Sequence, residues 1–410
     1  MAILLLTLTP LSVYAQVDSN ASFDIESNTI ANWPQGPDLL SSTGVLMEIE
    51  TGEVLYDKGM NELRYPASIT KVMTALLALE NSEPTDEVTF TASALQDMSL
   101  GTNIGMQEGE VLTMKQCLQV LMIKSANEVA NQIGEYIGGS QAEFAKMMNE
   151  KAATIGCKNT NFVNASGMPD DNHYTTAYDM ALIFREALKN KDFRKLIGKT
   201  GCTIPPTNKN PEKRSYHSSH AVFVEESSFH YKGCIGGKTG VTQEAHNTLV
   251  TGVKRGNIGF IAVVMRADDH ASVCTDTISL FDYVYNNFEL INETESSLLT
   301  PKGTKDQLEI TEEAGDNANE IIKTYSLGEH ALGTVRIISD NGEVTEAPET
   351  EQPASLAPTQ VPTSTKTPLL NNEKLQSLQT PQMIILVLAI LILLNLSLVV
   401  TKIIKNKKKL

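Results

Sequence analysis

A serine followed three residues later by a lysine is the first pair in the sequence that could do chemistry. It stands in Ser68-Ile69-Thr70-Lys71, at the start of an apolar run over 68–80 that predicts a helix. Positions i and i+3 of a helix share a face, so the Lys71 amine can reach the Ser68 hydroxyl. A base makes such a hydroxyl nucleophilic, and lysine can be that base where burial and nearby cations lower its pKa. Taken alone, the pair also fits a serine that only caps a helix.

A second group, Ser125-Ala126-Asn127, interrupts two helical runs, so its side chains can project from a tight turn. There the serine can relay a proton and the asparagine amide can hold a substrate amide. Ser125 can also cap the helix over 126–137, with Glu128 completing a capping box. A similar triplet, Ser339-Asp340-Asn341, lies in an acidic region and is typical of a turn.

The third group is Lys238-Thr239-Gly240, which follows Gly236-Gly237 and opens a strand-rich run. The glycines allow a substrate backbone to approach the edge of a sheet closely. The copy at Lys199-Thr200-Gly201 follows a helical stretch and lacks this setting. A nucleotide-binding P-loop would need a glycine five positions before Gly237, where the chain has Lys232, so that class of site is excluded.

Together, the three groups follow the order S-x-x-K, S-x-N, K-T-G, which resembles the signature of penicillin-binding proteins and serine β-lactamases. More narrowly, residues 38–288 resemble the low-molecular-weight D-alanyl-D-alanine carboxypeptidases of peptidase family S11. The words that carry this likeness are Arg64-Tyr65-Pro66-Ala67 before Ser68, Leu121-Met122-Ile123-Lys124 before Ser125, Val241-Thr242 after Gly240, Asn164-Ala165-Ser166-Gly167-Met168 and His173-Tyr174-Thr175-Thr176-Ala177. Where family members often carry an Asn-Thr-Asn-like segment, this chain has Ser218-Ser219-His220-Ala221, which leaves details of the substrate cleft open.

The resemblance implies acyl transfer at the carbonyl between two terminal D-alanines of a peptidoglycan stem peptide. Ser68 is then the nucleophile, Lys71 the expected base, and Ser125 a relay to the leaving D-alanine. The resemblance also implies that β-lactam antibiotics acylate Ser68 and that backbone N–H groups of Ser68 and Val241 form an oxyanion hole. The residues expected to bind substrate are Asn127, Lys238, Thr239 and Gly240. No metal or cofactor is expected, and the seven histidines include no H-E-x-x-H pair.

Two other functions remain to be weighed. A class A β-lactamase would need a deacylating glutamate in an E-x-x-L-N setting, and the nearest match, Glu186-Ala187-Leu188-Lys189-Asn190, has lysine where leucine belongs. A non-catalytic β-lactam sensor would need a cytoplasmic effector. A non-catalytic envelope scaffold would be expected to lose motif residues. Only about nine residues follow the last apolar run, and every motif residue is present.

The elements around these residues predict an α+β fold. The apolar patterns indicate a hairpin over 44–56, a second over 248–265 with a four-residue turn, and a helix over 271–286. Further helices are expected over 113–124, 126–137, 141–155 and 176–190. Strands, then helices, then strands favour an antiparallel sheet flanked by helices, with a helical subdomain. This is a β-lactamase/transpeptidase-like architecture by resemblance.

The composition narrows the partners. The net charge is −16, with 49 acidic and 33 basic residues, and an acidic body repels phosphate backbones, so nucleic acid is excluded as a partner. The five cysteines show neither a CxxC pair nor a metal-ligand spacing. They read as small buried hydrophobes, with one disulfide left possible but unassigned.

Both ends read as targeting segments. An apolar run followed by Val13-Tyr14-Ala15 predicts a signal peptide without its basic n-region; a buried first strand is the alternative. The 18 residues of 383–400 are apolar apart from an asparagine and a serine, about the minimum for a bilayer span. Five lysines follow, which predicts a cytoplasmic C-terminus and a catalytic part outside the cell membrane.

The sequence therefore predicts seven parts. They are a signal peptide (1–15), a leader (16–37), the carboxypeptidase domain (38–288), a small β-rich domain (289–343), a linker rich in Pro, Thr and Glu (344–382), a transmembrane helix (383–401) and a basic tail (402–410).

Overall fold

The central element of the fold is a five-stranded antiparallel sheet with the strand order β2-β1-β9-β8-β7. A computed structural model describes residues 23–96, 101–291, 298–315, 320–340 and 343–347. The strands are β1 (Thr43–Glu48), β2 (Val54–Lys58), β7 (Cys234–Thr242), β8 (His246–Arg255) and β9 (Ile258–Ala267). The pairing of β1 with β9 joins the two ends of the catalytic region, and both predicted hairpins are confirmed. The turn between β8 and β9 has two residues instead of four, because Arg255 already pairs with Ile258.

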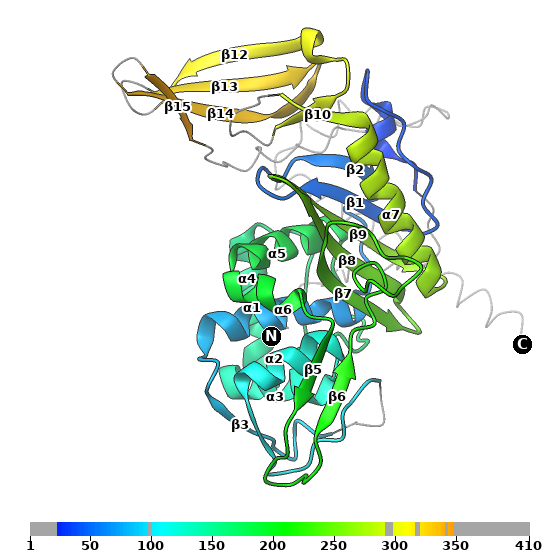
Figure 1. Ribbon diagram of the computed structural model, residues 1–410, viewed down its shortest axis with the longest axis vertical. Helices are drawn as coiled ribbons and strands as arrows, with labels where there is room; N and C mark the ends of the chain where they lie inside the picture. The colour runs from blue at the N-terminus through cyan, green and yellow to red at the C-terminus, as the bar shows by residue number, and fades with distance from the viewer. Residues whose placement is uncertain (1–22, 97–100, 292–297, 316–319, 341–342, 348–410) are drawn as a thin grey trace, which may run out of the picture. The chain divides into compact units, whose positions relative to one another are not determined.

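Helices cover both faces of this sheet (Figure 1). On one face, Leu46, Phe260 and Val264 pack against α7 (His270–Asn287). On the other, Val45 and Val263 belong to the core of a helical group. That group consists of α1 (Lys71–Asn81), α2 (Met114–Ile123), α3 (Asn127–Gly138), α4 (Gln141–Ile155), α5 (Ala177–Lys189) and α6 (Lys191–Ile197). Alternate residues of a strand point to opposite faces, so apolar residues at successive positions bury both.

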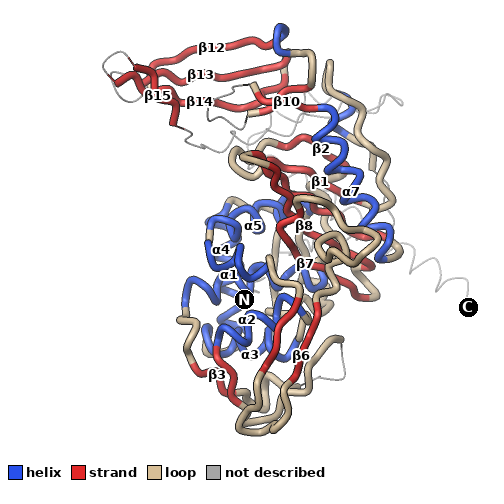
Figure 2. Tube along the Cα trace, viewed as in Figure 1, coloured by secondary structure: helices blue, strands red, loops and turns tan. Residues whose placement is uncertain are grey.

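Two short two-stranded sheets lie beside the helical group. The first pairs β3 (Glu87–Thr89) with β4 (Val111–Thr113), and the second pairs β5 (Gly201–Ile204) with β6 (Arg214–His217). The β5–β6 hairpin was not predicted, and it contains Gly201 of the second Lys-Thr-Gly triplet as its first residue. Figure 2 shows these short strands in red and the neighbouring helices in blue.

The expected β structure beyond residue 288 is present. The pair β10 (Phe288–Leu290) and β11 (Leu299–Pro301) precedes a sheet of β12 (Leu308–Ala314), β13 (Glu320–Leu327), β14 (His330–Asp340) and β15 (Glu343–Ala347). Strand β15 runs past residue 344, where the sequence places the start of the linker. Trp33, Phe288 and Tyr325 share one apolar cluster with the sheet face under α7. The division of the chain into a catalytic and a β-rich domain stays a prediction.

No helix within the described ranges is long and apolar enough to cross a membrane. The predicted signal peptide (1–15), transmembrane helix (383–401) and basic tail (402–410) lie outside the described residues, as does the linker beyond Ala347.

Candidate active site

Ser68 lies in a single 3₁₀ turn, η2 (Ala67–Thr70), that leads directly into α1. Its hydroxyl does not cap the helix: the capping position of α1 is Thr70, which makes no side-chain cap bond. The Ser68 Oγ instead accepts a hydrogen bond from Lys71 Nζ at 2.9 Å. Ala67, just before it, has φ +51°, a left-handed conformation that non-glycine residues adopt rarely. The capping explanation for this serine is therefore wrong, and the strained turn is typical of a functional position.

Lys71 is completely buried, and its amine is held by three acceptors. Besides Ser68, Nζ donates to Asn127 Oδ1 at 2.8 Å and to the Ser166 carbonyl at 2.6 Å. Burial, and then the positive charge of Lys238, hold the pKa of Lys71 well below its usual value of 10.5, while Glu128 opposes them. A lysine with a lowered pKa spends more time as a neutral amine, the form that can take a proton from a serine.

Ser125 also has a left-handed backbone, with φ +63°. The helix α3 begins two residues later, its capping residue is Ala126, and no side-chain cap bond is present, so the expected capping box with Glu128 is wrong. The turn aims the hydroxyl at the third motif, where Lys238 Nζ donates to Ser125 Oγ at 3.0 Å. The backbone N–H of Asn127 donates to the Thr102 carbonyl at 2.8 Å, which ties this turn to the loop before β4.

Strand β7 brings the third motif to the nucleophile. Lys238 is buried, and burial lowers its pKa to about 7. A β-carbon at Gly240 would lie 3.0 Å from the Ser68 nitrogen, so only glycine allows the strand this close. Thr239 Oγ1 lies 3.3 Å from Ser219 Oγ, and Val241 is 66% exposed at the end of the motif. Whether the N–H groups of Ser68 and Val241 form the oxyanion hole stays a prediction.

A loop between α4 and α5 supplies contacts that the sequence motifs did not assign. Asn164 Oδ1 accepts hydrogen bonds from the backbone N–H groups of Ser166, Gly167 and Met168. In the same turn, the Ser166 carbonyl accepts the hydrogen bond from Lys71 Nζ. A turn held by an asparagine side chain is a local signal in the sequence, but the contact of the Ser166 carbonyl with Lys71, 95 positions earlier, leaves no such signal.

The same loop is locked onto the nucleophile turn. A β-carbon at Gly167, which has φ +82°, would fall 1.9 Å from the Ala67 carbonyl oxygen. His173 Nδ1 accepts the Val163 N–H at 3.2 Å, so its Nε2 donates to Thr70 Oγ1 at 3.0 Å. Burial lowers the pKa of His173 to about 4, which keeps the ring neutral for these two bonds. This histidine positions the turn and does not reach Ser68 in any described contact.

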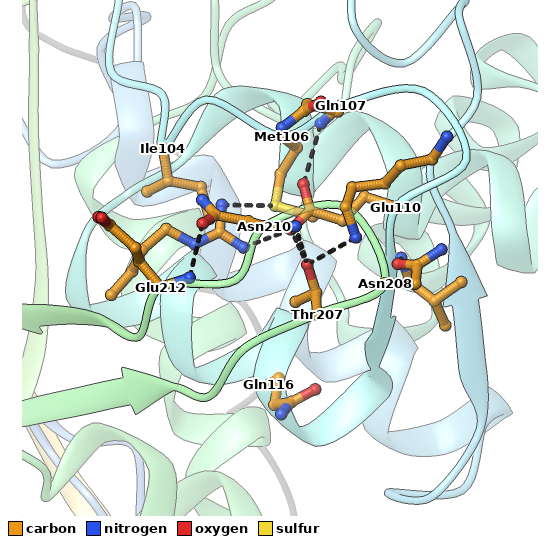
Figure 3. A network of polar contacts seen from close by, with 12 residues as sticks. Ile104, Met106, Gln107, Glu110, Gln116, Thr207, Asn208, Asn210 and Glu212 are labelled. Carbon is orange, nitrogen blue, oxygen red and sulfur yellow. Dashed lines mark hydrogen bonds and ion pairs between the residues drawn. The ribbon is translucent and has the colours of Figure 1, made fainter.

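A buried ion pair at Glu110 joins the loop before β4 to the β5–β6 hairpin, and Figure 3 shows the polar contacts around Glu110. Arg214 of β6 donates to Glu110 Oε1, and the Thr207 hydroxyl donates to the same oxygen at 2.7 Å. The Gln107 N–H donates to Glu110 Oε2 at 3.1 Å. These contacts hold the β5–β6 connection against the loop that gives Asn127 its Thr102 partner.

The residues considered for a β-lactamase glutamate, for a disulfide and for a metal site have other surroundings in the structure. Glu186, the nearest match to a β-lactamase glutamate, forms ion pairs with Lys189 at 2.9 Å and Lys151 at 3.8 Å. All five cysteines are free thiols. Within the described residues, no three His, Cys, Asp or Glu side chains are grouped so that they could hold a metal ion.

The arrangement suits acyl transfer to a serine. It combines a hydroxyl bonded to a buried lysine with a second hydroxyl bonded to a second buried lysine. An anionic substrate group at the Lys238 end would meet a cation and two hydroxyls, which is a good setting for a carboxylate.

Comparison with known proteins agrees with this chemistry. Residues 30–269 match the model of the peptidase S11 family, described as D-alanyl-D-alanine carboxypeptidase. The chain is 30% identical over 373 residues to the D-alanyl-D-alanine carboxypeptidase DacF of Bacillus subtilis, covering 84% of this chain and 90% of that one. It is also 30% identical over 247 residues to DacB2 of Mycobacterium tuberculosis, covering 60% and 80%.

Two solved structures show the same fold. A D-alanyl-D-alanine carboxypeptidase from Mycobacterium tuberculosis superposes with a TM-score of 0.57 at 26% identity, covering 65% of this chain and 97% of that one. Penicillin-binding protein 6B from Escherichia coli gives 0.63 at 22% identity, covering 76% and 98%.

Proposed function

The chain belongs to the peptidase S11 family and is a serine-type D-alanyl-D-alanine carboxypeptidase; we propose that Ser68 is its nucleophile and Lys71 the base that activates it. The observation that carries this assignment is the 2.9 Å bond between Lys71 Nζ and Ser68 Oγ, at a lysine whose pKa is lowered by burial. The chain is accordingly a penicillin-binding protein of the low-molecular-weight class.

In the acylation step, the neutral Lys71 amine takes the Ser68 proton as Oγ attacks the carbonyl between the two terminal D-alanines. The leaving D-alanine nitrogen needs a proton, which Lys71, now protonated, passes on through the Ser125 hydroxyl, so that Lys71 is neutral again and Ser125 keeps its proton; Lys238 holds that hydroxyl in place. The negative charge on the carbonyl oxygen is stabilised by the N–H groups of Ser68 and Val241. Water then attacks the acyl-enzyme, which releases the shortened peptide and returns the proton to Ser68.

The substrate is held from both sides of the reacting bond. Lys238 and Thr239 take the terminal carboxylate, because this buried ammonium and the adjacent hydroxyl offer a charge-assisted contact. The Asn127 amide takes the peptide on the acyl side, and Gly240 lets β7 pack against the backbone of Ser68 and so places the substrate-binding strand beside the nucleophile. The substrate is the peptidoglycan stem peptide that ends in D-Ala-D-Ala, and β-lactams bind in its place.

Covalent labelling with a fluorescent penicillin tests the nucleophile. Wild-type protein should be labelled, and Ser68→Ala should not be. Ser82→Ala is the matched control, because Ser82 follows α1 and only donates to the Ala78 carbonyl. Undiminished labelling of Ser68→Ala would contradict the assignment. Steady turnover of a chromogenic cephalosporin, in place of a stoichiometric burst, would instead favour a β-lactamase.

We also propose that the protein is exported and held at the cell membrane by its C-terminal segment. The apolar run 383–401 and the lysines after it support this, with the catalytic domain outside and the tail in the cytoplasm. Full-length protein should sediment with membranes and resist extraction by salt, whereas a chain ending at residue 382 should be released. Equal sedimentation of both chains would refute the anchor.

A further inference from the structure

The side chain of Met168 lies against the amide of Asn127 at the active site. Asn127 Nδ2 donates to the Met168 sulfur at 3.2 Å. The orientation of this amide is set from its other end, because Oδ1 accepts from Lys71 Nζ at 2.8 Å. One N–H of the amide that faces the substrate is therefore directed at a thioether.

The backbone of Met168 is fixed while its side chain is free to adapt. Its N–H donates to Asn164 Oδ1 at 3.2 Å, and its carbonyl accepts from Asn164 Nδ2 at 2.9 Å. The side chain is half-buried and has three rotatable bonds, which makes methionine adaptable. Another side of the amide is covered by Gly101, where a β-carbon would lie 2.5 Å from Asn127 Nδ2 and 3.3 Å from the Met168 sulfur.

We propose that Met168 is a specificity-determining residue, whose sulfur occupies the Asn127 N–H until a substrate carbonyl displaces it. This inference rests on the proposed function and adds to it. A thioether is a weak acceptor and a carbonyl oxygen a strong one. The thioether therefore lowers, without abolishing, the advantage that an amide carbonyl on the acyl side of the reacting bond gives a substrate, and it has no such effect on substrates that lack this carbonyl.

Two β-lactams separate these cases, because they share one nucleus and differ in this carbonyl. Benzylpenicillin carries an acylamino side chain, and 6-aminopenicillanic acid has a free amine in its place. The measured quantity is the ratio of their second-order rate constants for acylation of Ser68. A change that harms the site in general slows both compounds, so it leaves the ratio unchanged.

Two substitutions of similar size should move the ratio in opposite directions. Met168→Leu removes the acceptor, so the ratio should rise by about 2- to 5-fold, the range of one weak hydrogen bond. Met168→Gln places a carbonyl oxygen beside the amide, so the ratio should fall by about 10-fold. Met147→Leu, on α4, is the matched control and should leave the ratio at the wild-type value.

The outcomes are distinct. Opposite shifts in the two variants support the proposal, while shifts in the same direction, or unchanged ratios, overturn it. If wild-type protein were acylated by neither compound, the assignment of Ser68 would fail, and this result is separate from any change in the ratio.

Discussion

Replacing Arg214 with methionine should destabilise the protein by about 3 kcal/mol, because it leaves a buried carboxylate without its cation. The Glu110 side chain is fully buried, and Arg214 is only 12% exposed. Removing one partner of such a pair costs about 3–5 kcal/mol in general. The lower end applies here, since Glu110 keeps its bonds from the Thr207 hydroxyl and the Gln107 N–H.

A double-mutant cycle gives the sharper test. Glu110→Gln should cost about 1.5 kcal/mol, since it replaces charge-assisted bonds by neutral ones. In the combined variant the buried charge is gone, so its loss should be smaller than the sum of the single losses by about 2 kcal/mol. Urea unfolding followed by tryptophan fluorescence measures all three values. Lys195→Met, which breaks an exposed pair with Asp192, is the control and should change little.

The same variants report on function. The ion pair holds the loop whose Thr102 carbonyl accepts the Asn127 N–H, so Arg214→Met should also slow acylation of Ser68. Additive losses of stability, within about 0.5 kcal/mol, would refute the claim that the two side chains act as a buried pair.

Three further predictions concern the site. Lys71→Arg should lower the acylation rate by about 10²–10⁴-fold, because arginine stays protonated and cannot act as the base. In the wild-type protein, the acylation rate measured from pH 5 to 9 should fall as the pH falls, because Lys71 gains its proton. Gly240→Val leaves Ser68 in place but should slow its acylation at least about 10-fold, because the new β-carbon would lie 2.4 Å from Thr248 Oγ1. A normal rate would show that β7 can shift to make room. Burial holds the pKa of His220 at about 4 against the usual 6.5, so protonation of this residue in the unfolded chain weakens the fold between pH 6.5 and 4 by about 3 kcal/mol. His220→Gln should remove this part of the loss of urea stability and leave the part that His173 contributes, and an unchanged slope would contradict this origin.

Much of the fold follows from local patterns. Apolar periodicity located both hairpins and the helices α2 to α5 to within a few residues, because each buries a continuous face. The choice of Lys238 over Lys199 also depended on local context, namely the glycines that precede a strand. The pairing of β1 with β9 had no such signal, since it joins segments more than 200 residues apart and depends on the tertiary fold.

The site was predicted less completely than the fold. The motifs named Ser68, Lys71 and Lys238, but not the Ser166 carbonyl on Lys71 or the ion pair of Glu110 with Arg214, because such contacts leave no pattern in adjacent residues. For Ser125, the sequence instead suggested a contact that the structure does not contain. Its sequence fits a helix cap well, yet tertiary contacts hold its backbone in a left-handed turn and turn its hydroxyl to Lys238.

The contacts around Ser68 also have a consequence for the order in which the protein becomes competent during synthesis. The chain emerges from its N-terminus, so Ser68 is made well before the segments that complete its surroundings. Asn127 bonds to Lys71 across 56 positions, Ser166 across 95, and Thr248 reaches Pro66 across 182. In a nascent chain that ends before β8, Ser68 is therefore not yet reactive. Under the proposed assignment of Ser68, a covalent penicillin label on it counts finished, folded molecules, and it can serve as a maturation assay for variants in any of these distant segments.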